Sequence, residues 1–182
     1  MQLRVERHPS PVGTLLLVTS PDGVLRALDY EAYEARMKRL LGLHYGAYQL
    51  EEIAPSPALA RALEAYFGGD LHALDALPIA TNGTPFQQSV WRALREIPAR
   101  STLNYGQLAA RLGRPSAARA VGLANGANPI AIVVPCHRVI GANGALTGYA
   151  GGLETKRWLL AHEGAERVPN PKATKRAESC AL

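Results

Sequence analysis

Cysteine, methionine and phenylalanine are scarce in this chain of 182 residues, which contains two of each. The two cysteines, Cys136 and Cys180, are too few for the disulfide framework of a small secreted protein. No group of cysteine and histidine residues has the spacing of zinc ligands, so we expect no metal site. The chain also lacks an apolar run long enough to span a membrane, and its first residues lack a signal-peptide pattern. These absences predict a protein of the reducing cytoplasm that has no membrane partner.

Charge is unevenly distributed along the chain, which carries a formal net charge of +5. Residues 1–80 hold 7 Lys and Arg against 10 Asp and Glu, whereas residues 81–182 hold 13 against 5. An acidic first part joined to a basic second part suggests a polyanion as the partner of the second part. A basic protein without such a partner has the same balance, so charge alone leaves both alternatives open.

Residues 1–80 have the pattern of a small α/β domain with a short antiparallel sheet. An Asp22-Gly23 turn between two apolar runs is typical of a β-hairpin, and glycines after two helical patterns indicate that the helices end at Gly42 and Gly68. The expected elements are strands over 1–7, 13–19 and 24–30 and helices over 31–41 and 57–67. The histidines of this part are isolated from one another, so we expect it to be a scaffold.

Residues 84–164 follow a linker over 77–83 and begin with a clear helix start. Thr84 can cap the helix with Gln87 completing a capping box, and Pro85 occupies the first helical position. Two short helical patterns over 105–112 and 116–125 then surround a tight turn. In a basic domain, this arrangement is typical of a helix-turn-helix.

The second of these helices is rich in small side chains and has one long cation, Arg119. Its small residues include Ala118, Ala120 and Gly122, which allow close approach to a narrow surface such as the minor groove of DNA. Small residues are equally suited to a helix packed into the core. The pattern alone leaves both interpretations open.

The chemically distinctive segment is Pro135-Cys136-His137-Arg138, which interrupts an apolar run over 132–140. A thiolate is a strong nucleophile, and a neighbouring imidazole can accept or steer the thiol proton. A lone cysteine in an apolar run is also often a small buried side chain, so the dipeptide does not decide between the two. A strand is expected over 130–134, a glycine-rich loop over 141–152, a helix over 156–162 and a disordered basic tail over 165–182.

Residues 84–164 resemble the active-site domain of the O6-alkylguanine-DNA alkyltransferases, also called methylated-DNA–protein-cysteine methyltransferases. The resemblance rests on several motifs in the order and spacing of that family, and residues 1–80 are only loosely similar to its variable N-terminal domain. The motifs are Pro135-Cys136-His137-Arg138-Val139, Tyr105-Gly106-Gln107-Leu108-Ala109, 117–122, Asn128-Pro129, 148–153 and 158–164. The implied fold is α+β, with a ribonuclease H-like N-terminal domain over 1–80 and a winged-helix-like domain over 84–164.

The resemblance implies direct-reversal DNA repair, in which Cys136 accepts the alkyl group of O6-alkylguanine once and irreversibly. His137 would take the thiol proton through a water, Glu163 would orient the imidazole and Asn128 would order the turn behind it. Tyr105 would donate to the departing base and crowd its phosphate, and Arg119 would fill the gap left by a flipped base, with Ala118, Ala120 and Gly122 facing the groove. Val139, Tyr149 and Ala150 would line the substrate pocket.

The implied partner is double-stranded DNA bound by a monomer without a cofactor, and O4-alkylthymine is a second candidate substrate. A helix-turn-helix regulator would leave the 135–139 motif and Glu163 unexplained. A Cys-His hydrolase would leave Arg119 and the basic balance unexplained. A non-catalytic alkyltransferase-like protein lacks the cysteine that is present here.

Overall fold

The computed structural model describes residues 1–165, and the predictions for the basic tail and Cys180 lie outside that range, apart from Ala165. Helices and strands are mixed along the described chain, as the predicted α+β class requires. The elements are β1 (Gln2–His8), β2 (Leu15–Thr19), β3 (Leu25–Tyr30), η1 (Glu31–Tyr33), α1 (Glu34–Tyr45), β4 (Gln49–Glu52), α2 (Pro57–Phe67), α3 (Pro85–Arg95), β5 (Leu103–Asn104), α4 (Tyr105–Arg111), α5 (Ala118–Gly126), η2 (Cys136–Arg138), β6 (Val139–Ile140) and α6 (Leu153–His162). Within residues 1–165, every helix is too short or too polar to cross a lipid bilayer.

The N-terminal sheet has the strand order β3-β2-β1-β4. The three predicted strands form antiparallel neighbours, with Val5 opposite Val18 and Leu17 opposite Leu28. The fourth strand, β4, was not predicted and pairs parallel with β1, so the predicted antiparallel sheet carries one parallel strand at its edge. The sequence of β4, Gln49-Leu50-Glu51-Glu52, has one apolar residue and no alternation that predicts a strand.

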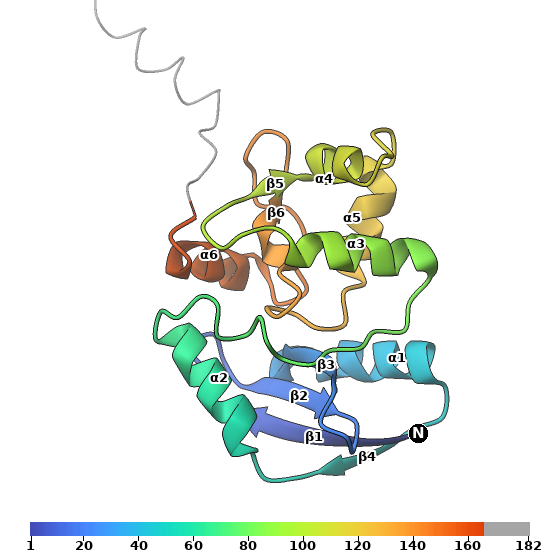
Figure 1. Cartoon of the computed structure of the whole chain (residues 1–182), viewed down its shortest axis with the longest axis vertical. Helices are drawn as coiled ribbons and strands as arrows, with labels where there is room; N and C mark the ends of the chain where they lie inside the picture. The colour runs from blue at the N-terminus through green and yellow to red at the C-terminus, as the bar shows by residue number, and fades with distance from the viewer. Residues whose placement is uncertain (166–182) are drawn as a thin grey trace, which may run out of the picture.

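The central strand β2 is buried on both faces of the sheet, and its side chains alternate between two cores. Leu16 and Val18 pack with Met37 and Leu41 of α1. Leu15 and Leu17 face the other way, into a core that they share with the helices of residues 84–164. Figure 1 shows the sheet and α1 in blue on one side and helices α3 to α6 on the other. The two parts of the chain are therefore joined by one continuous apolar core.

Helix α1 is longer than the sequence predicted. Helix α1 continues through Gly42 and ends before Gly46, whose φ of 66° stops it. Nothing lies within 4 Å of a Cβ built at Gly42, so this glycine neither requires a turn nor prevents a helix.

The predicted strand over 130–134 was wrong, because the segment curls into a buried turn instead. The amide of Val134 donates to the carbonyl oxygen of Ile130 at 3.0 Å, and Ile132 has a φ of 66°. Only Ile130 forms a β-bridge, with Leu28 of β3. Apolar side chains are buried equally well in a tight turn, so the apolar run did not distinguish the two structures.

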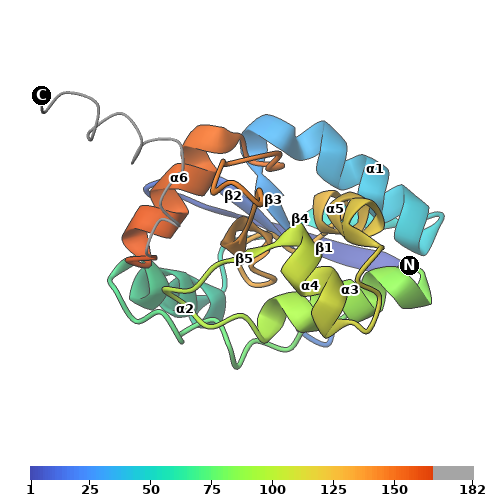
Figure 2. The same ribbon diagram turned by 90° about the horizontal axis from the view of Figure 1, so that it is seen from above.

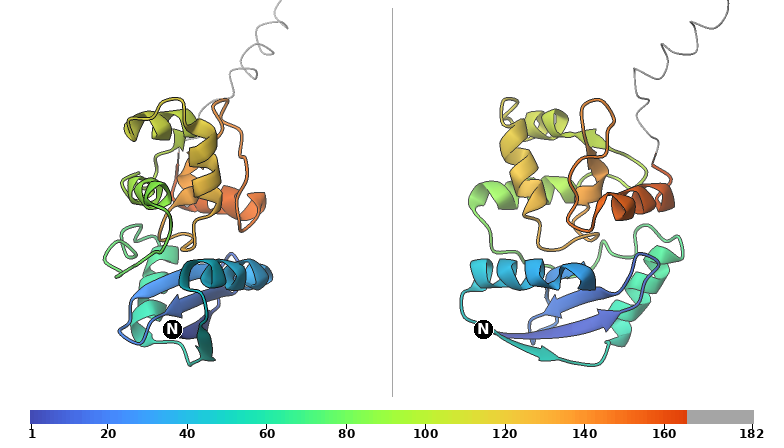
Figure 3. Two further views of the ribbon diagram at one scale, coloured as in Figure 1. Left: turned by 90° about the vertical axis from the view of Figure 1, so that its right-hand side faces the viewer. Right: turned by 180° about the vertical axis from the view of Figure 1, so that it is seen from behind.

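The predicted helix starts and the pair of short helices are present. Thr84 and Gln87 form the capping box of α3, and Asn104 and Gln107 form a second one at the start of α4. Helix α4 lies at the end of the molecule farthest from the sheet, and α5 runs back from it toward α1 (Figures 1 and 2). The views from the side and from behind show the same arrangement, with α6 next to α2 (Figure 3).

Candidate active site

Cys136 begins the short helix η2, directly after the buried turn. Its side chain is 4% exposed, and its amide donates to the carbonyl oxygen of Val134 at 2.8 Å. Burial raises the pKa of the Cys136 thiol, and the hydrogen bond from Asn128 and the charge of Lys156 only partly oppose this effect. The thiol is therefore protonated at neutral pH, and a nucleophilic reaction needs a base close to it.

The carboxylate of Glu163, one residue beyond α6, is the centre of a fully buried polar cluster. Its Oε1 lies 2.9 Å from His137 Nε2, and it also accepts hydrogen bonds from Arg138 Nη2 at 2.9 Å and from the Tyr66 hydroxyl at 2.8 Å. Arg138 Nε donates to Oε2 at 2.9 Å. Burial on its own would raise the pKa of Glu163, but the bonds from His137 and Arg138 outweigh it and hold that pKa far below its ordinary value.

His137 presents its two ring nitrogens to different surroundings. Because Nε2 faces the carboxylate of Glu163, Nε2 carries the proton and Nδ1 is the free acceptor. Nδ1 is buried without a hydrogen-bond partner among residues 1–165. Burial lowers the pKa of His137 and outweighs the opposing effect of Glu163, so the ring is neutral. A neutral imidazole with a free acceptor nitrogen is the form that a general base requires.

Two asparagines fix the backbone around the thiol. Asn128 Nδ2 donates to the carbonyl oxygen of Val134 at 2.8 Å, and Asn128 Oδ1 accepts from the amide of Ile130 at 3.0 Å. Asn125 Nδ2, in α5, is 3.5 Å from the carbonyl oxygen of Cys136. The structure thus places Asn128 inside the turn that leads to Cys136.

Two of the predicted pocket residues, Tyr149 and Val139, lie next to the short helix that begins with Cys136. Tyr149 lies edge-on to the His137 ring, and its hydroxyl is 2.7 Å from that of Tyr30 in β3. Val139 is fully buried, and its carbonyl oxygen accepts a hydrogen bond from Lys156 Nζ at 2.6 Å. Ala150, the next residue after Tyr149, is partly exposed.

The predicted DNA-binding residues lie on and beside α5. Arg119 and Ala120 are exposed and Ala118 is partly exposed, whereas Val121 and Ala124 on the inner face of the helix are buried. The interpretation of α5 as a core helix therefore holds for its inner face only.

Tyr105 and Gly122 are neighbours in space. A Cβ built at Gly122 would be 3.7 Å from the Tyr105 ring, which is an ordinary van der Waals distance. Gly122 therefore lies directly beside the ring. The Tyr105 hydroxyl accepts a weak hydrogen bond of 3.4 Å from Thr147, in the loop that leads to Tyr149. Tyr105 thus connects the outer helices with the loop over the candidate pocket.

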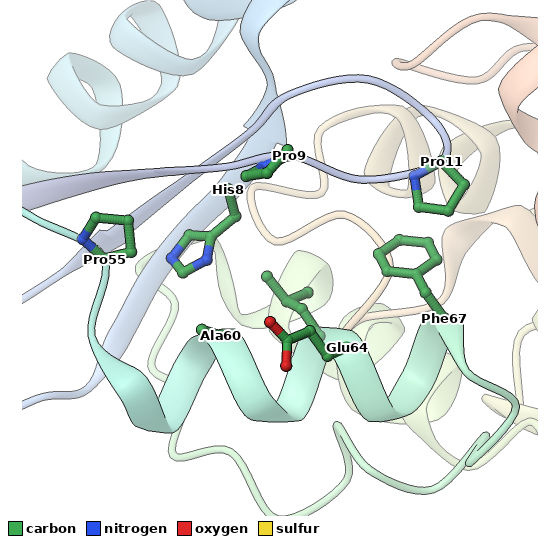
Figure 4. Close-up of a pocket in the computed structure, with 8 residues that line it drawn as sticks. His8, Pro9, Pro11, Pro55, Ala60, Glu64 and Phe67 are labelled. Atoms are coloured by element: carbon green, nitrogen blue, oxygen red, sulfur yellow. The ribbon is translucent and has the colours of Figure 1, made fainter.

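A separate pocket lies between α2 and the end of β1 (Figure 4). It is lined by His8, three prolines and apolar side chains of α2, together with Glu64. The Nε2 of His8 lies 3.0 Å from Oε2 of Glu6. None of the predicted site residues lines this pocket.

Comparison with known proteins identifies the family to which the chain belongs. The family model described as "6-O-methylguanine DNA methyltransferase, DNA binding domain" matches residues 85–165. The chain is 55% identical to the methylated-DNA–protein-cysteine methyltransferase of Salmonella typhimurium, over 90% of this chain and 97% of the relative. The chain belongs to the methylated-DNA–protein-cysteine methyltransferase family. A Methanosarcina acetivorans methyltransferase of the same name is 47% identical over 86% of this chain and 95% of its own.

Solved structures of methyltransferases agree with this assignment. The Mycobacterium tuberculosis protein OGT in complex with DNA has a TM-score of 0.73 and 42% identity, covering 90% of this chain and 93% of that chain. The O6-methylguanine-DNA methyltransferase of Pyrococcus kodakaraensis has a TM-score of 0.70 at 26% identity and covers 90% and 99%.

The candidate site also contains residues for which the sequence predicted no role, among them Asn125 and four others. Tyr30 and Tyr66 come from the part predicted to be a scaffold, and Arg138 and Lys156 come from the second part. Arg138 stood next to His137 in the central motif, so its type and position were a usable signal. The two tyrosines gave none, because they lie 119 and 97 residues from their partners Tyr149 and Glu163.

Proposed function

We propose that this methyltransferase repairs DNA by direct reversal, moving the alkyl group of an O6-alkylguanine to its own Cys136. The observation that carries the proposal is the buried His137–Glu163 pair at 2.9 Å, directly beside a buried thiol. It is the arrangement expected for a thiol whose proton must be removed at the moment of reaction.

The transfer is a displacement at the alkyl carbon. The thiol proton of Cys136 moves to His137, by way of a water, while the sulfur forms a bond to the alkyl carbon. The bond between that carbon and guanine O6 breaks, and its electron pair leaves with the base. Tyr105 passes its hydroxyl proton to the ring nitrogen of the departing guanine, which therefore leaves as a neutral base. Glu163 stabilises the imidazolium that forms on His137, and the proton of that imidazolium returns through solvent to the Tyr105 oxygen. The products are an S-alkylcysteine and an unmodified guanine.

The reaction takes place once per molecule. A thioether has no hydrolytic route back to the thiol under physiological conditions, so Cys136 is consumed and no cofactor is needed. This protein is therefore a stoichiometric acceptor, and its capacity for repair equals the number of molecules present.

The DNA is bound through α5, and the damaged nucleotide leaves the base stack. The alkyl group of a stacked O6-alkylguanine lies in the major groove, out of reach of a thiol that is 4% exposed. The exposed Arg119 enters the duplex from the minor groove and fills the gap, with the small side chains of Ala118 and Ala120 allowing close approach. Val139, Tyr149 and Ala150 then receive the base.

Several finer features belong to the same proposal. The domain over 1–80 is ribonuclease H-like and the domain over 84–164 is winged-helix-like, and the protein works as a cytoplasmic monomer. O4-alkylthymine is a second candidate substrate, since it presents an alkyl group on the corresponding oxygen. The basic balance of residues 81–182 supports the choice of DNA.

Mass spectrometry tests the proposal directly. After incubation with duplex DNA containing O6-methylguanine, the intact protein should gain one methyl group, and fragmentation should place it on Cys136. The variant Cys136→Ala should gain nothing, whereas the matched control Cys180→Ala should gain the same mass as the wild type. An unchanged wild-type mass with tight DNA binding would contradict transfer, and release of an acid from a test ester would instead support a Cys-His hydrolase.

A further inference from the structure

The Tyr66 hydroxyl reaches from the N-terminal part of the chain into the carboxylate cluster of the site. Tyr66 lies in the last turn of α2, and its side chain is 2% exposed. Burial and the adjacent carboxylate of Glu163 raise the pKa of Tyr66 far above its ordinary value, so the hydroxyl keeps its proton. It is therefore a permanent donor to Glu163 Oε1, at 2.8 Å.

The two oxygens of Glu163 carry unequal numbers of hydrogen bonds. Oε1 is shared by His137 Nε2, Arg138 Nη2 and the Tyr66 hydroxyl, whereas Oε2 is held by Arg138 Nε. A carboxylate offers about two lone-pair positions on each oxygen, so three donors saturate Oε1. Each donor to Oε1 consequently competes with the other two for the same negative charge.

We infer that Tyr66 is a positioning residue for alkyl transfer, because it occupies Oε1 of Glu163 and so limits how strongly that oxygen binds His137. The inference rests on the proposed function, in which His137 takes the proton of Cys136. A base that is held too tightly by its carboxylate stays protonated and cannot accept another proton. Tyr66 keeps the imidazole available by drawing charge away from the Glu163–His137 bond.

The direction of the effect follows from the groups that surround His137. These are Glu163 at Nε2, the neighbouring Cys136 and Arg138, the ammonium group of Lys156 and the edge of the Tyr149 ring. Removing the Tyr66 hydroxyl leaves all of them in place and concentrates charge on Oε1. The imidazolium form of His137 is then better stabilised, and its pKa rises. A single hydrogen bond to a charged group corresponds to about one to two pH units. We expect about half of that effect to reach His137 through Glu163, which is a shift on the order of half to one pH unit.

The variant Tyr66→Phe tests this inference without removing the packing of the ring against Phe67 and His162. Transfer is followed in single turnover, from pH 5 to 8, with a short single strand that contains O6-methylguanine. Because protonated His137 cannot act, the acid limb of the rate profile should move upward by half to one unit, which lowers the rate on that limb about threefold to tenfold. The rate at the alkaline plateau should stay close to that of the wild type.

The matched control is Tyr45→Phe, which removes the same hydroxyl from another tyrosine of the N-terminal part. Tyr45 donates to the carbonyl oxygen of Ala80 at 3.2 Å and makes no contact with the cluster. Its acid limb should coincide with that of the wild type. A Tyr66→Phe profile with an unmoved limb, or with an equal loss at every pH, would overturn the inference, since the hydroxyl would then act through packing alone.

Two further measurements separate this inference from the proposed function. The ring of His137 can be titrated by NMR in protein labelled at histidine nitrogen, and its pKa should be higher in Tyr66→Phe whether or not transfer occurs. In a Glu163→Gln background, the Tyr66→Phe change should no longer shift His137. A shift that persists there would overturn the route through Glu163, whereas a wild-type protein that takes up no methyl group would overturn only the proposed function.

Discussion

Arg36 of α1 and Asn128 of the turn before the thiol are joined directly, because Arg36 Nη2 donates to the carbonyl oxygen of Asn128 at 2.9 Å. The same nitrogen donates to the carbonyl oxygen of Gly126, the last residue of α5, at 2.8 Å. The other end of the guanidinium binds Asp29 of β3, with 2.6 Å between Nη1 and Oδ2. One side chain of the N-terminal part thus holds both the end of the proposed DNA-binding helix and the start of the turn that carries Cys136.

Replacing Arg36 with methionine should destabilise the protein markedly. The Asp29 side chain is 1% exposed, so the substitution leaves a buried carboxylate without its counterion and two carbonyl groups without their donor. We expect the free energy of unfolding to fall by about 3 kcal/mol in urea titrations. The control Lys38→Met breaks an exposed pair on the same helix, with Glu34, and should change it by less than about 1 kcal/mol. Equal effects of the two variants would contradict a special role of Arg36.

Stability should fall as the solution becomes acidic. The folded-state pKa of His137 is lowered by burial, so below about pH 6.5 the unfolded chain binds a proton that the folded protein does not. The folded-state pKa of Glu163 is also lowered, which adds a second loss below about pH 4.5. Both groups bind more protons in the unfolded state, so the free energy of unfolding decreases as pH decreases. Urea titrations at pH 7, 6, 5 and 4 measure this slope.

The variant Glu163→Gln should flatten the loss below pH 4.5, because its side chain does not titrate. The control Glu154→Gln, whose side chain is 89% exposed, should keep the wild-type slope. A wild-type stability that is constant between pH 7 and 4 would refute the assignment of a neutral His137 and an ionised Glu163 in the folded protein.

Gly151 should not tolerate a side chain. A Cβ built there would lie 2.3 Å from Cε2 of Tyr30, a ring that is itself 3% exposed. The variant Gly151→Ala therefore displaces Tyr30 from Tyr149 or moves the loop over the pocket. We expect a loss of about 1–3 kcal/mol in the free energy of unfolding, together with slower methylation of Cys136 in a mass-spectrometric time course.

A helical glycine provides the control for Gly151. No atom lies within 4 Å of a Cβ at Gly42 inside α1, so Gly42→Ala should stabilise the protein by about 0.5–1 kcal/mol. Its rate of methylation should be unchanged. A stable and fully active Gly151→Ala protein would show that Tyr30 is free to move.

The variant Arg119→Ala should slow repair of duplex DNA far more than repair of a single strand. In the proposed function, a flipped base leaves a gap in the duplex that Arg119 fills. Because unstacking costs a few kcal/mol, we expect a loss of at least about tenfold. A single strand has no such gap. Parallel single-turnover rates on the two substrates give the ratio, with Arg61→Ala on the distant helix α2 as a control for the lost charge. Equal slowing on both substrates would contradict insertion.

Local signals in the sequence predicted the elements that depend on local chemistry. Thr84 and Gln87 marked a helix start because a capping box is made by residues three apart. Asp22-Gly23 marked a hairpin because a tight turn is made by adjacent residues. The prediction that Gly42 ends a helix was wrong. A glycine inside a helix lowers stability by about 1 kcal/mol, and the burial of Met37, Leu40 and Leu41 of α1 outweighs that loss.

Elements that depend on distant partners could not be predicted from one sequence. Strand β4 is polar and forms because it can pair with the edge of β1. The segment 130–134 forms a turn because two of its amides donate to carbonyl oxygens within the same segment. The same limit applies to the site. Glu163 was predicted from the resemblance of its motif to a known family. Tyr66 and Arg36 bind partners that are 90 or more residues away in the sequence, and a periodic pattern in the sequence cannot predict such contacts.

The burial of Cys136 protects the thiol of protein that has not yet accepted an alkyl group. A thiol that is 4% exposed and has a raised pKa provides little thiolate to peroxides or to soluble electrophiles. Since each molecule can accept one alkyl group, a cysteine lost to a stray oxidant is a whole molecule lost. Enclosure of the sulfur therefore lengthens the chemical lifetime of unused protein and, under the proposed function, reserves its single reaction for a flipped base.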